Sequence, residues 1–274
     1  MKVRNQLSKG IKQLKWVVFY LFLCLQIANS LASETLNYLV IEDQAEPFQI
    51  IDDAKQNSGI ISDLVFKIFD DSPYQIRVNS YPFKRMVKMI NAGLAPLWIT
   101  YGSSKWQSPQ NLNLSECSIL KVKHVLLPPK GETVQLNGIE GLLGQRVILM
   151  FGFDYPNLDE YLSAKKILEL RVMSYPSAFK ALALDRGFGF IEMESRIQYN
   201  LKINGEKYSD YHSVDLSSVI PKYDIRCALS PEMPEKIKRY IDDQCDQLKG
   251  SGEFKKIINR YLTSTNESSE LGSE

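Results

Sequence analysis

One stretch near the amino-terminal end limits the possible folds of this chain more than any other. Leu36–Ile41 is a short apolar run rich in β-forming residues, which predicts a buried strand. Pro47 prevents that strand from continuing, and a polar cluster at 52–59 predicts a turn. Apolar residues then recur at helical spacing over 60–68, so a helix follows. A buried strand, a ligand-sized loop and an amphipathic helix in this order predict an α/β protein.

The first 32 residues have the three regions of a secretory signal peptide. Five cations and no acid precede an apolar run of 12 residues, Trp16–Ile27, and the small residues Ser30 and Ala32 follow it. That run is shorter than the roughly 20 residues that span a bilayer. We therefore expect residues 1–32 to be cleaved and the protein to be periplasmic; the alternative is an uncleaved membrane anchor.

Removal of the leader makes the chain mildly acidic. The formal net charge of the whole chain is +1, and it falls to −4 without the five cations of residues 1–32. Such a protein has no basic footprint for nucleic acid. The remaining 242 residues suffice for one large or two small domains. The polar, acidic stretch 264–274 is expected to be a disordered tail.

Segments typical of strands and helices alternate along the rest of the chain. Apolar or alternating runs predict strands at 74–80, 97–104 (running into a loop), 119–127, 147–151, 170–174, 188–193 and 220–230. Helical periodicity predicts helices at 86–90, 176–184, 231–248 and 251–262. The run at 147–151 is apolar throughout, as in a strand covered on both faces.

Several of these segments resemble the extracellular solute-binding proteins of family 3, the periplasmic receptors of polar amino-acid importers. The matching segments are Pro47-Phe48 followed by GIISDL, then YPFKRMVKMINAG, LLGQRVILMFGFDY, and SPEMPEKI with KGSGEFKKIINRYL. The resemblance implies a type II periplasmic-binding-protein fold, with two α/β lobes joined by a two-strand hinge. Lobe 1 would comprise residues 33–118 and 224–263, and lobe 2 residues 119–223. It further implies a monomeric protein that traps a small polar or cationic solute between the lobes, for an inner-membrane ABC permease or a sensor.

The register of the family motifs gives candidate ligand-binding positions. The resemblance implies Phe48, Arg85, Trp98, Thr100 and Tyr101 in lobe 1, and Asp154, Tyr155 and Glu192 in lobe 2. Ordinary structural roles are the alternatives: surface exposure for Arg85 and Glu192, core packing for Trp98 and Tyr101, and a helix cap for Asp154.

One departure from the family concerns the ligand's α-carboxylate. In the family, an Arg soon after the strand 97–104 grips that carboxylate through a bidentate fork. This chain has Lys105 and Trp106 instead, and a Lys is a point charge that does not replace the fork. We therefore expect a ligand other than a standard α-amino acid held in the usual way. The lobe 1 aromatics suit an apolar or ring-bearing solute, and the lobe 2 acids suit a cationic or hydroxyl-rich one.

The sequence has no motif for catalysis or for metal binding. His124 and His212 lack the spacing of a metal site, and neither a nucleophile elbow nor a phosphate-binding loop occurs. We expect no enzyme, no cofactor and no metal. Two alternatives stay open: a dehydratase-like periplasmic enzyme on the same scaffold, with Glu192 as general acid, and a sensory or interaction module without a transport role.

Three cysteines follow the leader: Cys117, Cys227 and Cys245. In an oxidising compartment one disulfide and one buried thiol is the simplest arrangement, although sequence alone does not fix the pairing. The strands that hold Cys117 and Cys227 are expected to cross between the lobes side by side. We therefore predict a Cys117–Cys227 disulfide.

We predict export with cleavage near Ala32. Mass spectrometry of the secreted protein should find Ser33 or a near neighbour at the amino terminus, because the small residues Ser30 and Ala32 occupy the positions that signal peptidase requires. A mature protein that retains Met1 would contradict this prediction.

Overall fold

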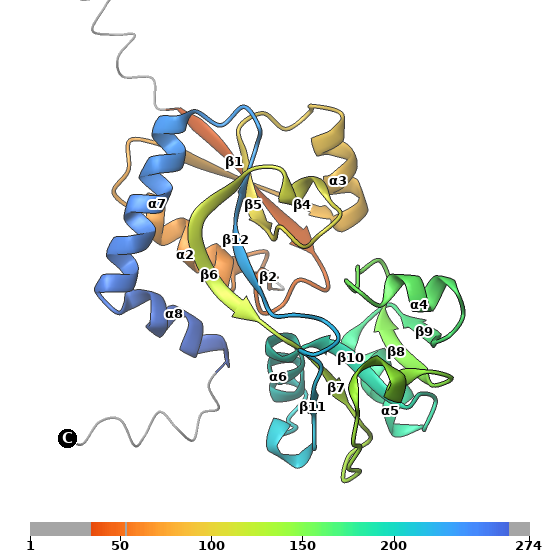
Figure 1. Ribbon diagram of the computed structural model, residues 1–274. Helices are drawn as coiled ribbons and strands as arrows, with labels where there is room; N and C mark the ends of the chain where they lie inside the picture. The colour runs from red at the N-terminus through yellow and green to blue at the C-terminus, as the bar shows by residue number, and fades with distance from the viewer. Residues whose placement is uncertain (1–33, 53, 263–274) are drawn as a thin grey trace, which may run out of the picture.

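The computed structural model describes residues 34–52 and 54–262, which form two α/β lobes (Figure 1). Lobe 1 is built on a five-stranded sheet of order β4-β1-β5-β12-β6, and lobe 2 on one of order β11-β7-β10-β8-β9. The lobe 1 strands are β1 (Thr35–Glu42), β4 (Gln75–Pro82), β5 (Trp98–Gly102), β6 (Leu114–Val122) and β12 (Tyr223–Leu229). The lobe 2 strands are β7 (His124–Leu127), β8 (Arg146–Met150), β9 (Leu168–Val172), β10 (Gly189–Met193) and β11 (Val214–Asp215). The predicted signal peptide and tail lie outside the described residues.

The strand, loop and helix predicted near the amino terminus are confirmed. β1 is parallel to both of its neighbours, β4 and β5, and its central residues are buried. A short hairpin, β2 (Ile50–Ile51) and β3 (Asn57–Ser58), leads into α2 (Ile60–Phe69). The buried Gln49 ties this loop to β1, because its side-chain nitrogen donates to the Tyr38 hydroxyl and to the Leu39 carbonyl, both at 2.9 Å. The buried side-chain amide of Gln49 is thus paired.

Gly59 allows the loop to turn into α2. Its φ is 107°, a backbone conformation that residues with a side chain rarely adopt. A Cβ at this position would lie 2.7 Å from the Phe48 carbonyl oxygen. A substitution at Gly59 would therefore strain the backbone and push the loop away from the helix.

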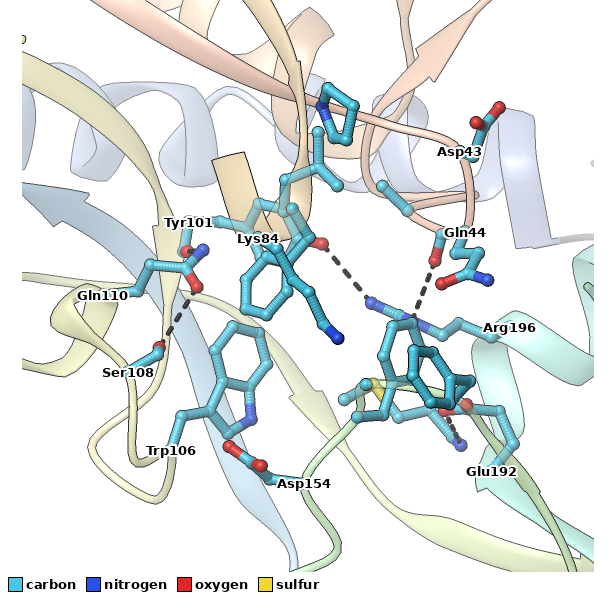
Figure 2. A pocket seen from close by; sticks show the side chains of 18 of the residues that line it. Asp43, Gln44, Lys84, Tyr101, Trp106, Ser108, Gln110, Asp154, Glu192 and Arg196 are labelled. Carbon is cyan, nitrogen blue, oxygen red and sulfur yellow. Dashed lines mark hydrogen bonds between the residues drawn. The ribbon is translucent and has the colours of Figure 1, made fainter. Parts of the chain in front are cut away.

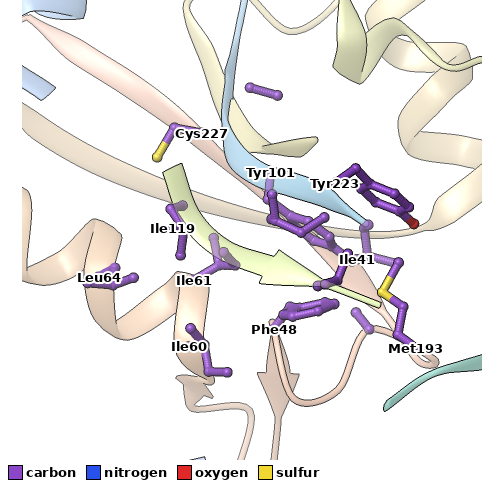
Figure 3. Close-up of a cluster of buried hydrophobic side chains, with 14 of the residues drawn as sticks. Ile41, Phe48, Ile60, Ile61, Leu64, Tyr101, Ile119, Met193, Tyr223 and Cys227 are labelled. Atoms are coloured by element: carbon purple, nitrogen blue, oxygen red, sulfur yellow. The ribbon is translucent and has the colours of Figure 1, made fainter. Parts of the chain in front are cut away.

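Helices cover both faces of the lobe 1 sheet (Figure 1). α3 (Phe83–Asn91) lies on one side, and α2 lies on the other with α7 (Glu235–Gly250) and α8 (Glu253–Leu262). The core between α2 and the strands includes Ile60, Ile61 and Leu64, and it continues past Met193 into lobe 2 (Figure 3). The apolar faces predicted for these helices are therefore the faces that the sheet buries.

The chain passes between the lobes twice. Lys123 alone separates β6 of lobe 1 from β7 of lobe 2, so the strand predicted at 119–127 is in fact parts of two strands. The return runs through residues 216–222 into β12, which pairs antiparallel with β6. Near this passage, the Trp106 indole nitrogen donates to the Tyr223 hydroxyl at 3.3 Å.

Lobe 2 combines parallel strands with an antiparallel edge. β8 is parallel to β9 and β10, whereas β7 runs antiparallel to β10 and β11. The lobe's helices are α4 (Asp159–Ser163), α5 (Tyr175–Ala183) and α6 (Glu194–Ile203). β9 ends two residues before the predicted limit of 174, because Ser174 caps α5 by accepting a hydrogen bond from the Ser177 amide.

Three 3-10 helices complete the fold: η1 (Pro109–Asn111), η2 (Gly138–Leu142) and η3 (Tyr208–Asp210). Within residues 34–52 and 54–262, no helix is long and apolar enough to cross a membrane.

The predicted Cys117–Cys227 disulfide is wrong: the structure joins Cys117 to Cys245, and Cys227 is a buried free thiol. β6 and β12 do pair, but their register shifts on both sides of Arg226, which leaves Cys117 without a partner residue on β12. Cys245 lies on α7, which packs against β6, and its Cα is 6.1 Å from that of Cys117. That separation suits a disulfide, whereas Cys227 lies in the core beside Ile119 (Figure 3).

Loss of this disulfide should destabilise lobe 1. It closes a loop over a sequence separation of 128 residues, and disulfides that close long loops typically contribute about 2–5 kcal/mol. Urea unfolding of Cys245→Ala should show a loss in that range. A non-reducing peptide map of Cys227→Ala, the matched control, should still contain Cys117 joined to Cys245; a wild-type map with Cys227 in the crosslink would contradict the structure.

Candidate functional site

A cavity of about 280 Å³ lies between the two lobes (Figure 2). Lobe 1 lines it with residues 41–45 after β1, 82–84 after β4, and Trp106, Ser108 and Gln110 after β5. Lobe 2 lines it with residues 151–155 after β8, Met173 after β9, Met193 at the end of β10, and Arg196 in the first turn of α6. Open α/β sheets bind ligands beyond the carboxyl ends of their strands. Both sheets thus present their ligand-binding edges to the same space.

The guanidinium of Arg196 is buried in the cavity wall and bridges the lobes. Arg196 lies in the first turn of α6 and is 4% exposed. Its Nη1 donates to the Gln44 carbonyl of lobe 1 at 3.0 Å and to the Tyr175 hydroxyl at 3.3 Å. Its Nη2 donates to the Tyr101 hydroxyl at 3.3 Å. All three acceptors are uncharged, and Nε has no partner.

Aromatic rings cover the same guanidinium. Its central carbon lies 4.6 Å from the ring centre of Phe153 and 5.2 Å from that of Phe48. Desolvated cation–π contacts of this kind stabilise a buried cation by about 2 kcal/mol. They do not neutralise its charge, and no ion pair involves Arg196 within the described part of the chain.

Glu192 and His124 are buried polar residues of the same cavity, on the neighbouring strands β10 and β7. One Glu192 carboxylate oxygen accepts from the Met193 amide at 2.7 Å, and the other has no partner. Burial raises the pKa of Glu192, and the charge of Arg196 opposes that shift. Burial and the same charge lower the pKa of His124 to about 3, so its imidazole is neutral at pH 7. Its Nδ1 has no partner.

We call Arg196, Glu192 and His124 the polar floor of the cavity. Each has a buried polar atom that forms no hydrogen bond with the protein, and such an atom costs about 1–3 kcal/mol. Folded proteins keep few of these atoms. Three residues of one cavity, from three different elements, thus have hydrogen-bonding atoms that the protein leaves without a partner.

The walls above the floor are mainly aromatic. Tyr101 and Trp106 of lobe 1 are in edge contact, with ring centres 5.7 Å apart, and Phe151, Phe153 and Tyr155 of lobe 2 also line the cavity. The mouth carries exposed charged residues, including Asp43, Lys84 and Asp154. The site thus combines apolar walls with a small buried set of polar groups, as small-molecule sites do.

The structure brings some of the candidate ligand-binding residues to the cavity and places others elsewhere. Tyr101, Asp154, Tyr155 and Glu192 line it, whereas Phe48, Trp98, Thr100 and Arg85 do not. Phe48, Trp98 and Thr100 are each at most 2% exposed, within the core of lobe 1. β5 is a central strand, which explains why Trp98 and Thr100 are covered. Arg85 is exposed and lies over the Tyr81 ring.

Lys105, which replaces the family's arginine, is exposed and lines a separate surface hollow beside β6 and β12. The family motifs in the sequence did not point to Arg196 as a site residue. A signal was present, because Arg196 belongs to a stripe at helical spacing with Ile197, Asn200 and Leu201, all of which are buried. A charged residue on the buried face of a helix requires a partner.

No cluster that could hold a metal ion occurs among the described residues. The polar floor offers a cation, a carboxyl group and a neutral imidazole, which can bind an uncharged or charged solute by hydrogen bonds.

The two lobes, the double crossing and the cavity between them define a two-lobed solute receptor of the type II periplasmic-binding class, as the sequence predicted. The family model for bacterial extracellular solute-binding proteins, family 3, matches residues 38–264. The chain therefore belongs to that family, whose members are extracellular binding proteins. No curated protein sequence matches it.

Solved structures share the fold at low sequence identity. A histidine-bound ABC transporter substrate-binding protein from Streptococcus pneumoniae has a TM-score of 0.65 and 14% identity, over 84% of this chain and 93% of that one. A variant of ArgBP from T. maritima has a TM-score of 0.63 and 16% identity, over 84% and 96%. The ancestral amino acid-binding protein AncCDT-1, a precursor of cyclohexadienyl dehydratase, has a TM-score of 0.63 and 14% identity, over 84% and 96%.

The buried His124 should make the protein less stable as the pH falls. Its pKa is about 3 in the folded protein and about 6.5 in an unfolded chain, so the unfolded chain takes up the proton first. The contribution of the neutral imidazole to the free energy of unfolding is complete above pH 6.5. It is lost as the pH falls towards 3, by up to about 1.4 kcal/mol per pH unit. His124→Phe retains an aromatic ring and removes this titration.

Urea unfolding between pH 7.5 and pH 4.5 measures the effect. The free energy of unfolding of wild type, relative to His124→Phe, should fall with decreasing pH, and the buried carboxyl groups common to both proteins cancel. His212→Phe, at an exposed loop position outside the cavity, is the matched control for a histidine-to-phenylalanine exchange. A constant difference between wild type and His124→Phe would contradict a neutral buried imidazole.

Proposed function

We propose that the protein is a periplasmic receptor that traps one small solute in the cavity between its lobes and presents the closed form to an inner-membrane ABC permease. The observation that carries this proposal is the polar floor: unpartnered buried atoms at the place where the strand ends of both lobes meet. Membership of the extracellular solute-binding family supports it. The two passages, at Lys123 and at residues 216–222, are where we place the hinge, close to the lobe limits expected from sequence.

Contacts between the lobes support closure around a solute. Arg196 of lobe 2 bonds to Gln44 and Tyr101 of lobe 1, and the Gln44 side chain donates to the Met173 carbonyl of lobe 2. The Lys84 amine of lobe 1 lies 4.6 Å from the Phe151 ring centre of lobe 2. Hinge closure brings such pairs together, and a solute that contacts both lobes favours the closed state.

We further propose that the protein binds its solute without transforming it. The dehydratase-like alternative has one supporting observation, a buried Glu192 whose pKa is raised and which lines the cavity. A general acid works together with a group that removes a proton, and the only imidazole of the cavity, His124, has a pKa of about 3 and is a poor base at neutral pH. We therefore favour binding over catalysis.

A receptor of this kind should be stabilised by its solute. At a concentration 100 times its dissociation constant, the solute should raise the free energy of unfolding by about 2.7 kcal/mol. Melting temperatures of the purified protein in a metabolite library would identify it, and chromatography of the same mixtures would detect any product. The absence of stabilisation by every solute would contradict the receptor, and formation of a product would favour the enzyme.

Titration calorimetry with Asp154→Asn would then test the mouth of the cavity. If the solute is cationic there, this variant should bind it up to about 5-fold more weakly, because an exposed ionic contact contributes about 1 kcal/mol or less. Asp185→Asn, in an exposed turn outside the cavity, is the matched control.

A further inference from the structure

We propose that the solute is a small monocarboxylate with an apolar or aromatic body, and that Arg196 of lobe 2 binds its carboxylate. The inference rests on the receptor function proposed above and names the class of solute and the residue that selects it. The carboxylate would thus be held by lobe 2, whereas the resemblance to the family led us to expect this group on lobe 1.

Arg196 has more hydrogen-bond donors than the protein has acceptors for them. A guanidinium has five N–H groups, and Arg196 forms three hydrogen bonds with Gln44, Tyr175 and Tyr101. Two N–H groups therefore have no protein acceptor, and Nε–H is one of them. Two N–H groups of one guanidinium are the number that a carboxylate accepts in a bidentate pair.

The positive charge of Arg196 also favours a bound anion. Arg196 is buried, and its three acceptors are neutral oxygen atoms. No carboxylate lies within ion-pair distance of this cation in the described part of the chain, although the charge of Glu192 acts on it. A buried cation that lacks an ion pair is costly, and a bound carboxylate offsets that cost. Lys84 is exposed at the mouth of the cavity, and Lys105 lies outside it. Arg196 is thus the buried cation that a carboxylate can reach from the cavity.

The rest of the polar floor selects the group beside the carboxylate. Glu192 and His124 each have an unpartnered buried atom that can accept a hydrogen bond. A hydroxyl group next to the carboxylate would donate to one of them. We therefore expect a 2-hydroxy acid to bind more tightly than the same acid without the hydroxyl.

The walls select the body of the solute. Tyr101, Trp106 and Phe153 present rings to the cavity, and these rings favour an apolar or aromatic body. The exposed carboxylates of Asp43 and Asp154 at the mouth would repel a second negative charge. A monocarboxylate fits this distribution of charge better than a dicarboxylate does.

Calorimetric titration of wild type with matched probes tests the inference. The probes share a phenyl or an isobutyl body and differ in the head group: carboxylate, 2-hydroxycarboxylate, neutral carboxamide, and amine. The carboxylates should bind, the 2-hydroxycarboxylates should bind more tightly, and each carboxamide should bind about 100-fold more weakly than its carboxylate, as expected for the loss of charged hydrogen bonds. This comparison needs no variant, so it holds even if a substitution at Arg196 prevents folding.

Variants then identify the residue. Arg196→Gln should weaken carboxylate binding about 100-fold and reduce the difference in affinity between the carboxylate and the carboxamide. Arg146→Gln removes the same charge from an exposed position of lobe 2. It should leave unchanged both the affinity for the carboxylate and the difference in affinity between the carboxylate and the carboxamide. Equal binding of carboxylate and carboxamide, preference for the amine, or carboxylate binding that Arg196→Gln leaves intact would overturn the inference.

The same experiments separate this inference from the receptor function. If the metabolite library yields a solute that lacks a carboxylate, the inference fails and the receptor function stands. If the library yields a different monocarboxylate with an apolar or aromatic body, and its binding needs Arg196, the inference is supported. A dicarboxylate or a polar carboxylate would overturn it. If no solute stabilises the protein, the receptor function itself fails.

Discussion

The arrangement of the two lobes depends on the antiparallel strand pair β6 and β12, from which the chain passes into and out of lobe 2. The ends of the strands in both sheets face the cavity between the lobes. Because parallel strands present their carboxyl ends at one edge of a sheet, each lobe has one edge suited to ligands. The two passages place these edges opposite each other, and the cavity follows from that arrangement. The Cys117–Cys245 disulfide anchors the same strand to α7, so the element that carries the chain between lobes is also fixed to the lobe 1 helices.

Within the cavity, the decisive physical feature is a buried positive charge that the protein only partly satisfies. Arg196 is stabilised by aromatic rings and neutral oxygen atoms from both lobes. These contacts favour the lobes being together, yet they leave donors without acceptors. In the receptor that we propose, the lobes must be able to close, and the largest gain in hydrogen bonding must come from the solute.

Lys105 and Trp106, which are neighbours in the loop after β5, line two different hollows. Lys105 is exposed because the loop after β5 directs it to a hollow beside β6 and β12, outside the cavity. Trp106 takes a place in the cavity wall and bonds to Tyr223 near the second passage. Lobe 1 thus contributes Tyr101 and Trp106 together with the exposed Lys84, and lobe 2 contributes the buried cation.

The sequence by itself determined the two-lobed α/β fold, because apolar periodicity and turn residues act locally and the family motifs span nearly the whole chain. It also identified Tyr101, Tyr155 and Glu192 as residues of the cleft, which the cavity includes. Tertiary structure alone decided three matters: the register shift that directs Cys117 to α7, the burial of Trp98 and Thr100 in a central strand, and the hydrogen bonds of Arg196 to residues of lobe 1. Each depends on contacts between residues far apart in the chain, and the spacing of residues along one element does not contain that information.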